Sequence, residues 1–201
     1  MEKNKIIEQT KLAFDLIQKL YYEVAFLIKE IEGQLSEADE RFVIGKPGGY
    51  HVTYISSTGL EQVNVKKWLP RKMSVFFVPE EMTELGGTTT TKFSDETKVI
   101  YVRIILDDDD INEPVIYFGV LFGFGENEIL NKRFSKLEQL LTSIEYRENT
   151  ILKNPKNINY EDVYIKFKGT LKKQDLFDLN NSEDVNKLIV EPALKMFRNI
   201  S

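Results

Sequence analysis

The fold is decided by residues 99–124, which read VIYVRIILDDDDINEPVIYFGVLFGF. Two apolar runs, 99–106 and 115–124, flank the polar segment 107–114. This pattern predicts a β-hairpin, because β-branched and aromatic side chains favour strands while Asp, Asn and Pro favour turns. The second run is apolar throughout, which is typical of a strand covered on both faces, so we expect it near the centre of a sheet. Arg103 in the first run predicts that this strand has one wetter face.

Working outward from the hairpin, four further segments have the composition of strands. The segment 163–168 alternates apolar and polar side chains, which places Val163, Ile165 and Phe167 on one buried face. The other three segments precede the hairpin. Segments 41–45 and 50–56 flank the turn Lys-Pro-Gly-Gly at 46–49, and the third segment is 73–78.

The longest periodic segment is 4–35, in which two rows of side chains fall on one face of a helix. One row repeats at intervals of four and three residues and the other at seven: Ile6, Thr10, Ala13, Ile17, Leu20, Val24, Leu27 and Ile31, with Ile7, Phe14, Tyr21, Ile28 and Leu35. We expect two more helices, at 128–147 and from Ser182 to Arg198, the latter kinked or divided by Pro192.

The order of elements predicts an α+β fold in two layers, with a mostly antiparallel sheet of about five or six strands. We expect one main domain over 1–148, a linker at 149–160 that is rich in Asn and Lys, and a strand–helix element at 161–201 packed on the same domain. By element order alone, this plan resembles that of GAF-like and PAS-like sensory domains.

Composition excludes several classes of function. The chain has 201 residues, a formal net charge of −5 and no cysteine, which argues against nucleic-acid partners, disulfides and thiolate metal sites. The longest apolar run, 115–124, is too short to span a bilayer as a helix, and the first residues do not have the apolar core of a signal peptide. We therefore expect a cytoplasmic protein with no membrane segment and no cofactor.

The densest group of oxygen ligands is the acidic turn at 107–110. Asp108, Asp110 and Asn112 match the first alternate positions of a calcium-binding loop, but Glu113 and Gly119 stand where that loop needs glycine and glutamate. We therefore interpret the segment as a solvated turn, with weak divalent-ion binding as the alternative. The only histidine, His51, has no nucleophile motif beside it and is interpreted as structural or simply exposed.

A basic segment at 66–72 combines four cations with the only tryptophan. It offers a candidate patch for an anionic partner, made of Lys66, Lys67, Trp68, Arg71 and Lys72. We expect instead that Trp68 is buried or half-buried against the sheet while the four cations extend into solvent, and we keep the anionic-partner patch as the alternative.

The helix at 4–35 gives the strongest indication of function. Its repeat of three and four residues continues over four heptads, and four apolar side chains lie off its main face: Leu12, Leu16, Tyr22 and Phe26. We therefore expect a non-enzymatic interaction or assembly module that binds a second copy or another protein through this helix. A small-ligand-sensing regulatory domain is the first alternative, and a divalent-metal-dependent enzyme is the second.

Overall fold

The hairpin predicted at 99–124 is present as strands β4 (Lys98–Ile105) and β5 (Val115–Phe122). They pair antiparallel along their full length, from Lys98 opposite Phe122 to Ile105 opposite Val115. The computed structural model describes residues 2–45, 48–53, 69–82, 96–124 and 137–200. Within these residues the two strands form the centre of a seven-stranded sheet, as their apolar composition predicts.

The sheet is antiparallel at every described pairing and has the order β1-β3-β4-β5-β7-β6, with β2 also paired to β3. The five outer strands are β1 (Phe42–Ile44), β2 (Tyr50–Thr53), β3 (Lys72–Pro79), β6 (Ile158–Glu161) and β7 (Lys166–Asp175). A 3-10 turn, η1 (Glu80–Met82), follows β3. The α+β class and the antiparallel sheet are therefore confirmed.

Strands β1 and β2 lie end to end along the same side of β3. Phe42 to Ile44 pairs with Pro79 to Phe77, and Tyr50 to Thr53 pairs with Val75 to Lys72, so both strands run in one direction. Residues 45–49 separate β1 from β2, and both ends of this interruption are bonded to Phe76 of β3. The N–H of Gly45 donates to the carbonyl of Phe76, and the N–H of Phe76 donates to the carbonyl of Gly49. The predicted turn therefore interrupts an edge strand without reversing it; Lys46 and Pro47 lie outside the described residues.

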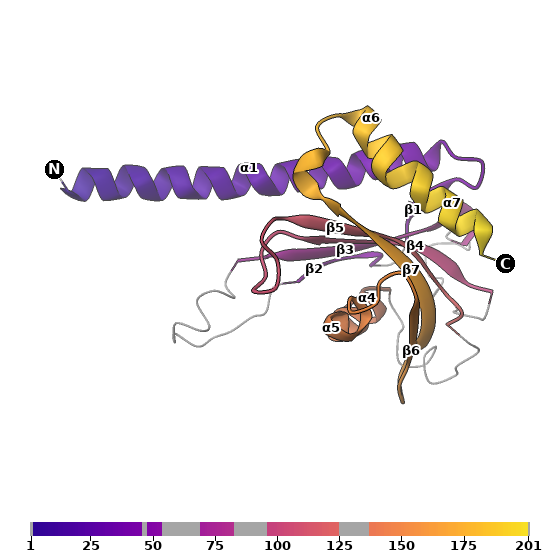
Figure 1. Ribbon diagram of the computed structural model, residues 1–201. Coiled ribbons are helices and arrows are strands. Elements are labelled where there is room, and N and C mark those ends of the chain that lie inside the picture. Colours follow the sequence, from indigo (N-terminus) through magenta and orange to yellow (C-terminus); the bar gives the residue numbers. More distant parts are fainter. Residues whose placement is uncertain (1, 46–47, 54–68, 83–95, 125–136, 201) are drawn as a thin grey trace.

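Helices cover both faces of the sheet, which adds a helical layer to the two layers predicted (Figure 1). Helices α4 (Leu137–Glu145) and α5 (Glu148–Ile151) pack on one face, where Leu141 and Ile144 join a core with β-strand side chains such as Phe76. On the other face lie α1 (Glu2–Ser36), α6 (Ser182–Val185) and α7 (Glu191–Asn199). Both layers are needed because successive side chains of β4 and β5 are apolar and point to opposite faces.

Residues 149–160 contain most of α5 and most of β6, where they were expected to form a linker. Ile151 and Ile158 are buried in the core beneath α4, so these residues belong to the sheet and its cover. The following strand is longer than predicted, since β7 extends to Asp175. Ile165 and Phe167 are buried as expected, but Val163 is 77% exposed, so its assignment to the buried face was wrong. It precedes β7, in the connection from β6.

The C-terminal helix accommodates Pro192 by changing its pitch. Residues Asn186–Val190 (η3) form a π-helical segment between α6 and α7, in which the N–H of Glu191 donates to the carbonyl of Asn186 five residues earlier. Pro192 then occupies the first turn of α7, where its missing N–H leaves no broken bond. The N-cap of α6 is Asn181, whose side chain accepts from the N–H of Asp184, and Ser182 is the first helical residue.

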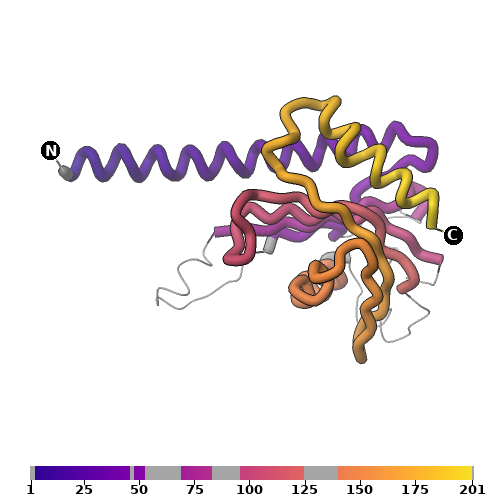
Figure 2. Tube along the Cα trace, in the orientation of Figure 1, coloured from indigo at the N-terminus to yellow at the C-terminus, as the bar shows by residue number. Residues whose placement is uncertain are grey.

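Helix α1 is longer than the body that it covers. Its 35 residues correspond to about 50 Å, and the tube in Figure 2 shows its N-terminal part extending past the sheet on its own. The C-terminal part packs on the sheet through Val24, Ile31 and Leu35. Among the described residues, no helix is both long enough and apolar enough to cross a membrane.

Candidate functional site

Helix α1 carries exposed apolar side chains along its N-terminal half and beyond it, as far as Phe26. The four residues predicted to lie off the main face, Leu12, Leu16, Tyr22 and Phe26, are between 55% and 71% exposed. Ile6, Ile7 and Phe14 are exposed as well, although they belong to the rows that continue into the buried half of the helix. The physical reason is that the N-terminal part of α1 extends past the end of the sheet (Figure 1).

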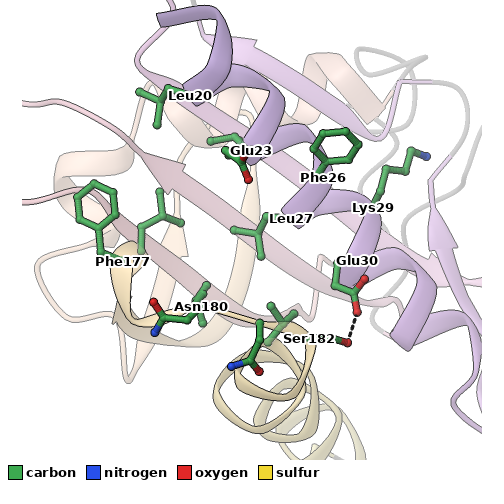
Figure 3. Close-up of a pocket in the computed structure, with 14 residues that line it drawn as sticks. Leu20, Glu23, Phe26, Leu27, Lys29, Glu30, Phe177, Asn180 and Ser182 are labelled. Atoms are coloured by element: carbon green, nitrogen blue, oxygen red, sulfur yellow. Dashed lines mark hydrogen bonds between the residues drawn. The ribbon is translucent and has the colours of Figure 1, made fainter. Parts of the chain in front are cut away.

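A groove lies between α1 and the connection from β7 to α6 (Figure 3). It has a volume of about 600 Å³, is open to solvent and is lined mostly by apolar atoms. Leu20 and Leu27 contribute from α1, while Phe177 and Leu179 contribute from the opposite side. Phe26 and Phe177 are exposed at 67% and 66%, so two aromatic rings remain in contact with water at this groove.

Local structure fixes the wall of the groove opposite α1. A 3-10 turn, η2 (Leu176–Asp178), buries Leu176 in the core and leaves its neighbour Phe177 exposed. At the C-terminal end, the Ser182 hydroxyl donates to Glu30 Oε1 at 2.5 Å, which closes the space between the two walls (Figure 3). Gln34 Nε2 also donates to the Ser182 carbonyl at 3.0 Å and to its hydroxyl oxygen at 3.1 Å, so three hydrogen bonds tie α1 to the start of α6.

The groove and the exposed part of α1 form a single surface. Leu12, Leu16, Leu20, Glu23 and Leu27 follow one another at spacings of four, four, three and four residues, which places them along one side of the helix. The last three of these line the groove. We call the whole surface, from Leu12 to Leu27 on α1 together with the groove, the α1 surface.

A polar network lies on the opposite face of the sheet, beneath α4 and α5. Arg103, 2% exposed, is its centre: its Nη1 donates to Glu145 Oε1 at 2.6 Å and to Ser74 Oγ at 2.8 Å, and its Nε donates to Glu148 Oε2 at 2.7 Å. The expectation that Arg103 marks a wetter face is therefore wrong, because the side chain is buried among ionic partners. Ser74 Oγ in turn lies 3.2 Å from the hydroxyl of Tyr101.

The network extends to His51 at one end and to the acidic turn at the other. His51 Nδ1 lies 2.8 Å from Glu145 Oε2, and Lys72 Nζ donates to Glu148 Oε1 at 2.7 Å and also to Asp108 Oδ2. The solvated interpretation of the acidic turn therefore does not apply to Asp108, whose carboxylate is paired with Lys72. Neighbouring Asp107 pairs with Arg71, with 2.9 Å between Oδ2 and Nη1.

These contacts explain the direction in which the pKa values of the network shift. Burial lowers the pKa of Lys72, but hydrogen bonds and charge from Asp108 and Glu148 raise it more, so the net shift is upward. Burial likewise raises the pKa of Asp108, and Lys72 with the backbone N–H groups of the turn lowers it below its usual value. Burial raises the pKa of Tyr101 to about 12, so its hydroxyl stays neutral beside Ser74.

The other candidate sites can now be placed. Of the basic patch, Arg71 and Lys72 both pair with acids of the turn, while Lys66, Lys67 and Trp68 lie outside the described residues. Within the described part of the chain, no group of three His, Asp or Glu side chains is arranged to hold a metal ion, and Asp108, the first proposed ligand, faces Lys72. The buried carboxylates Glu145 and Glu148 both bind Arg103 and so hold the sheet to its helical cover.

Sequence reasoning did not identify the wall at 176–182 or the network around Arg103. Glu145 and Glu148 are three residues apart, and Arg103 is a lone cation in an apolar strand; together these could have indicated a buried ion pair. Phe177 carries no such signal, because its exposure depends on the turn that buries Leu176. Comparisons with protein-family models, curated proteins and solved structures gave no match. Function must therefore be inferred from these surfaces.

Proposed function

We propose that the protein is a non-enzymatic assembly module that associates through α1, with a second copy of itself or with another protein. One observation carries this proposal: the N-terminal half of α1 extends past the sheet (Figure 2), and its apolar side chains, among them Leu12 and Leu16, are exposed. An isolated helix of about 15 residues is only marginally stable in water, and large apolar patches are uncommon on monomers. A partner that packs on α1 would supply the missing tertiary contacts.

The experiment places charge on exposed apolar positions of α1 and measures mass by light scattering. Leu16→Glu with Tyr22→Lys should abolish association while leaving the circular dichroism spectrum near that of the wild type, because both side chains are exposed. The matched control is Asn4→Glu with Gln18→Lys, which adds the same charges at exposed polar positions and should leave the mass unchanged. A wild type that stays monomeric at high concentration with no co-purifying protein would refute the proposal.

A substitution on the buried side of the same helix separates assembly from folding. Val24 is 2% exposed and packs in the core between α1 and the sheet. Val24→Glu should therefore unfold the domain, because a charge would be buried without a partner. Loss of both mass and circular dichroism in this variant would contrast with the loss of mass alone in the Leu16/Tyr22 variant.

The second candidate function, small-ligand sensing, is favoured by the volume of the groove. About 600 Å³ falls within the range of about 300–1,000 Å³ that is usual for ligand sites, and the lining is mostly apolar with a few polar groups. A monomeric wild type that binds the apolar dye 1-anilinonaphthalene-8-sulfonate, and loses the dye on Leu27→Glu, would favour this function over assembly.

A further inference from the structure

The groove beside α1 has the shape and chemistry to receive another helix. We propose that its occupant is the N-terminal half of α1 from a second copy of this chain, packed antiparallel, so that each copy fills the groove of the other. This inference rests on the proposed assembly function and specifies its partner and geometry. The chain cannot fill its own groove in this way, because α1 is a continuous helix whose N-terminal half points away from the body (Figure 1).

The two halves of α1 are complementary in length and in apolar character. The groove follows α1 from Leu20 to Glu30, about 15 Å, and the exposed segment from Ile6 to Leu16 has the same number of residues. An antiparallel pair that places Leu16 of one copy beside Leu20 of the other also brings Leu12 level with Val24, between the groove residues Glu23 and Leu27. The same contacts then form twice about a two-fold axis, as closed dimers require.

The distribution of charge along α1 also favours an antiparallel pair. Residues 2–19 contain four lysines and three acidic residues, whereas residues 20–36 contain three glutamates and one lysine. An antiparallel arrangement therefore sets a positive half beside a negative half, and it also opposes the two helix dipoles. A parallel arrangement would place halves of like charge together. In the antiparallel register Glu30 of one copy is level with Ile6 of the other, so the neighbouring Lys5 comes close to Glu30 at the closed end of the groove.

The exposed aromatic side chains at the groove also favour a helix as its occupant. Phe26 on α1 and Phe177 on η2 are both exposed, and a helix between the two walls would cover them. Aromatic residues at the centre of an interface commonly carry much of its binding energy. With two such grooves per dimer, the buried surface would reach the scale of about 800 Å² per partner that is usual for specific interfaces.

The experiment uses engineered cysteines, since the full chain contains none. In the proposed register Gln9 faces Leu27 of the partner, so the variant Gln9→Cys/Leu27→Cys should form a covalent dimer on oxidation. Within one helix these positions are about 27 Å apart, far beyond disulfide reach, so every cross-link joins two chains. Each single variant alone should not cross-link, and a mixture of the two single variants should give a covalent dimer.

A second pair of cysteines tests the same register without substituting Leu27, in case that substitution disturbs the local structure. Ala13→Cys/Glu23→Cys uses two exposed positions of α1 that face one another in the same register, and it should cross-link in the same way. Self-cross-linking of the single variants would show a parallel pair and overturn the antiparallel arrangement. A dimeric wild type whose double variants both fail to cross-link would also overturn it, while leaving assembly intact. A monomeric wild type would refute the proposed arrangement.

A substitution outside α1 tests whether the groove itself is used. Phe177→Glu should raise the dimer dissociation constant at least about tenfold, because the charge would be buried against the partner helix. The control is Tyr146→Glu, at an exposed aromatic residue next to α4 on the other face of the sheet, which should leave the dissociation constant unchanged. Equal dissociation constants for the Phe177 variant and the wild type would exclude the groove as the docking site.

Discussion

The guanidinium of Arg103 lies 2.6 Å from the carboxylate of Glu145, and both side chains are almost completely removed from solvent although 42 residues separate them in the chain. Together with Glu148, this pair ties the central strand β4 to helices α4 and α5. We predict that Arg103→Met lowers the free energy of unfolding by about 3–5 kcal/mol, because two buried carboxylates would lose their shared cation. Urea unfolding followed by circular dichroism measures the loss.

The control for that prediction is Arg198→Met. Arg198 binds Glu40 through two nitrogens, at 2.7 and 2.8 Å, so its geometry resembles that of Arg103, but the pair lies at the surface. Its loss should lower the free energy of unfolding far less than the loss of Arg103 does, because exposed ion pairs contribute little to stability. Equal losses in the two variants would show that burial does not determine the contribution of Arg103.

Protonation of Asp162 should contribute to the loss of folding stability at acid pH. Burial raises the pKa of its carboxyl, but the N–H groups of Tyr164 and Ile165, with Arg147 and Tyr160, lower the pKa below its usual value. Because the folded pKa lies below the unfolded one, the stabilisation is complete above the unfolded value of about 4 and is lost as the pH falls through the folded value. Asp162→Asn should cost about 1–2 kcal/mol at pH 7.

The pH profile gives the decisive comparison. The difference in unfolding free energy between wild type and Asp162→Asn should stay constant from about pH 7 to pH 5 and shrink below about pH 4. Glu161→Gln, at an exposed neighbour 3.4 Å from Lys166, is the control and should change the free energy by less than about 0.5 kcal/mol. A difference for Asp162→Asn that did not change with pH would contradict the assigned role.

Within the acidic turn, Asp108 should contribute to stability more than its exposed neighbours do. Asp108→Asn should lower stability by about 1 kcal/mol because the charge on Lys72 would lose one of its two partners. Asp110→Asn, at an exposed position, should change it by less than about 0.5 kcal/mol. Added calcium should leave both melting temperatures nearly unchanged, whereas a calcium-dependent rise that disappears in Asp108→Asn would restore the metal site.

Two glycines should respond oppositely to the same substitution. Gly33 lies inside α1 with no atom within 4 Å of an added Cβ, so Gly33→Ala should stabilise the protein by about 0.5–1 kcal/mol. At Gly119 in β5, an added Cβ would lie 2.0 Å from the carbonyl oxygen of Thr170. Gly119→Ala should therefore push β5 and β7 apart and lower the melting temperature. Calorimetry of the two variants checks both signs.

The sequence predicted the elements whose pattern is local. The hairpin of β4 and β5, the helix α1 and the α+β class follow from periodicity within single segments. Strand β6 and the second helical layer were not predicted, because Ile158 stands alone among polar residues and the choice of sheet face depends on distant packing. The hydrogen bonds that tie Gly45 and Gly49 to Phe76 likewise depend on β3, which lies about 30 residues further along the chain.

The candidate site was predicted only on its α1 side. Exposure of Leu12 and Leu16 follows from their angular position on the helix, which a single segment determines. The opposite wall, with Phe177, arises where β7 turns into α6, and nothing within 176–182 indicates that α1 lies opposite. Whether the α1 surface binds a second copy remains a prediction.

The interruption of the sheet edge between β1 and β2 has a consequence for solubility. An uninterrupted edge strand is a template on which another molecule can add a strand, and growth in this way leads to fibres. Here the edge beside β3 is divided between two short strands, β1 with three residues and β2 with four. The strand at the opposite edge, β6, has four residues. Strands this short offer little length for an added strand, so β1, β2 and β6 are poor templates for edge-to-edge pairing with another molecule.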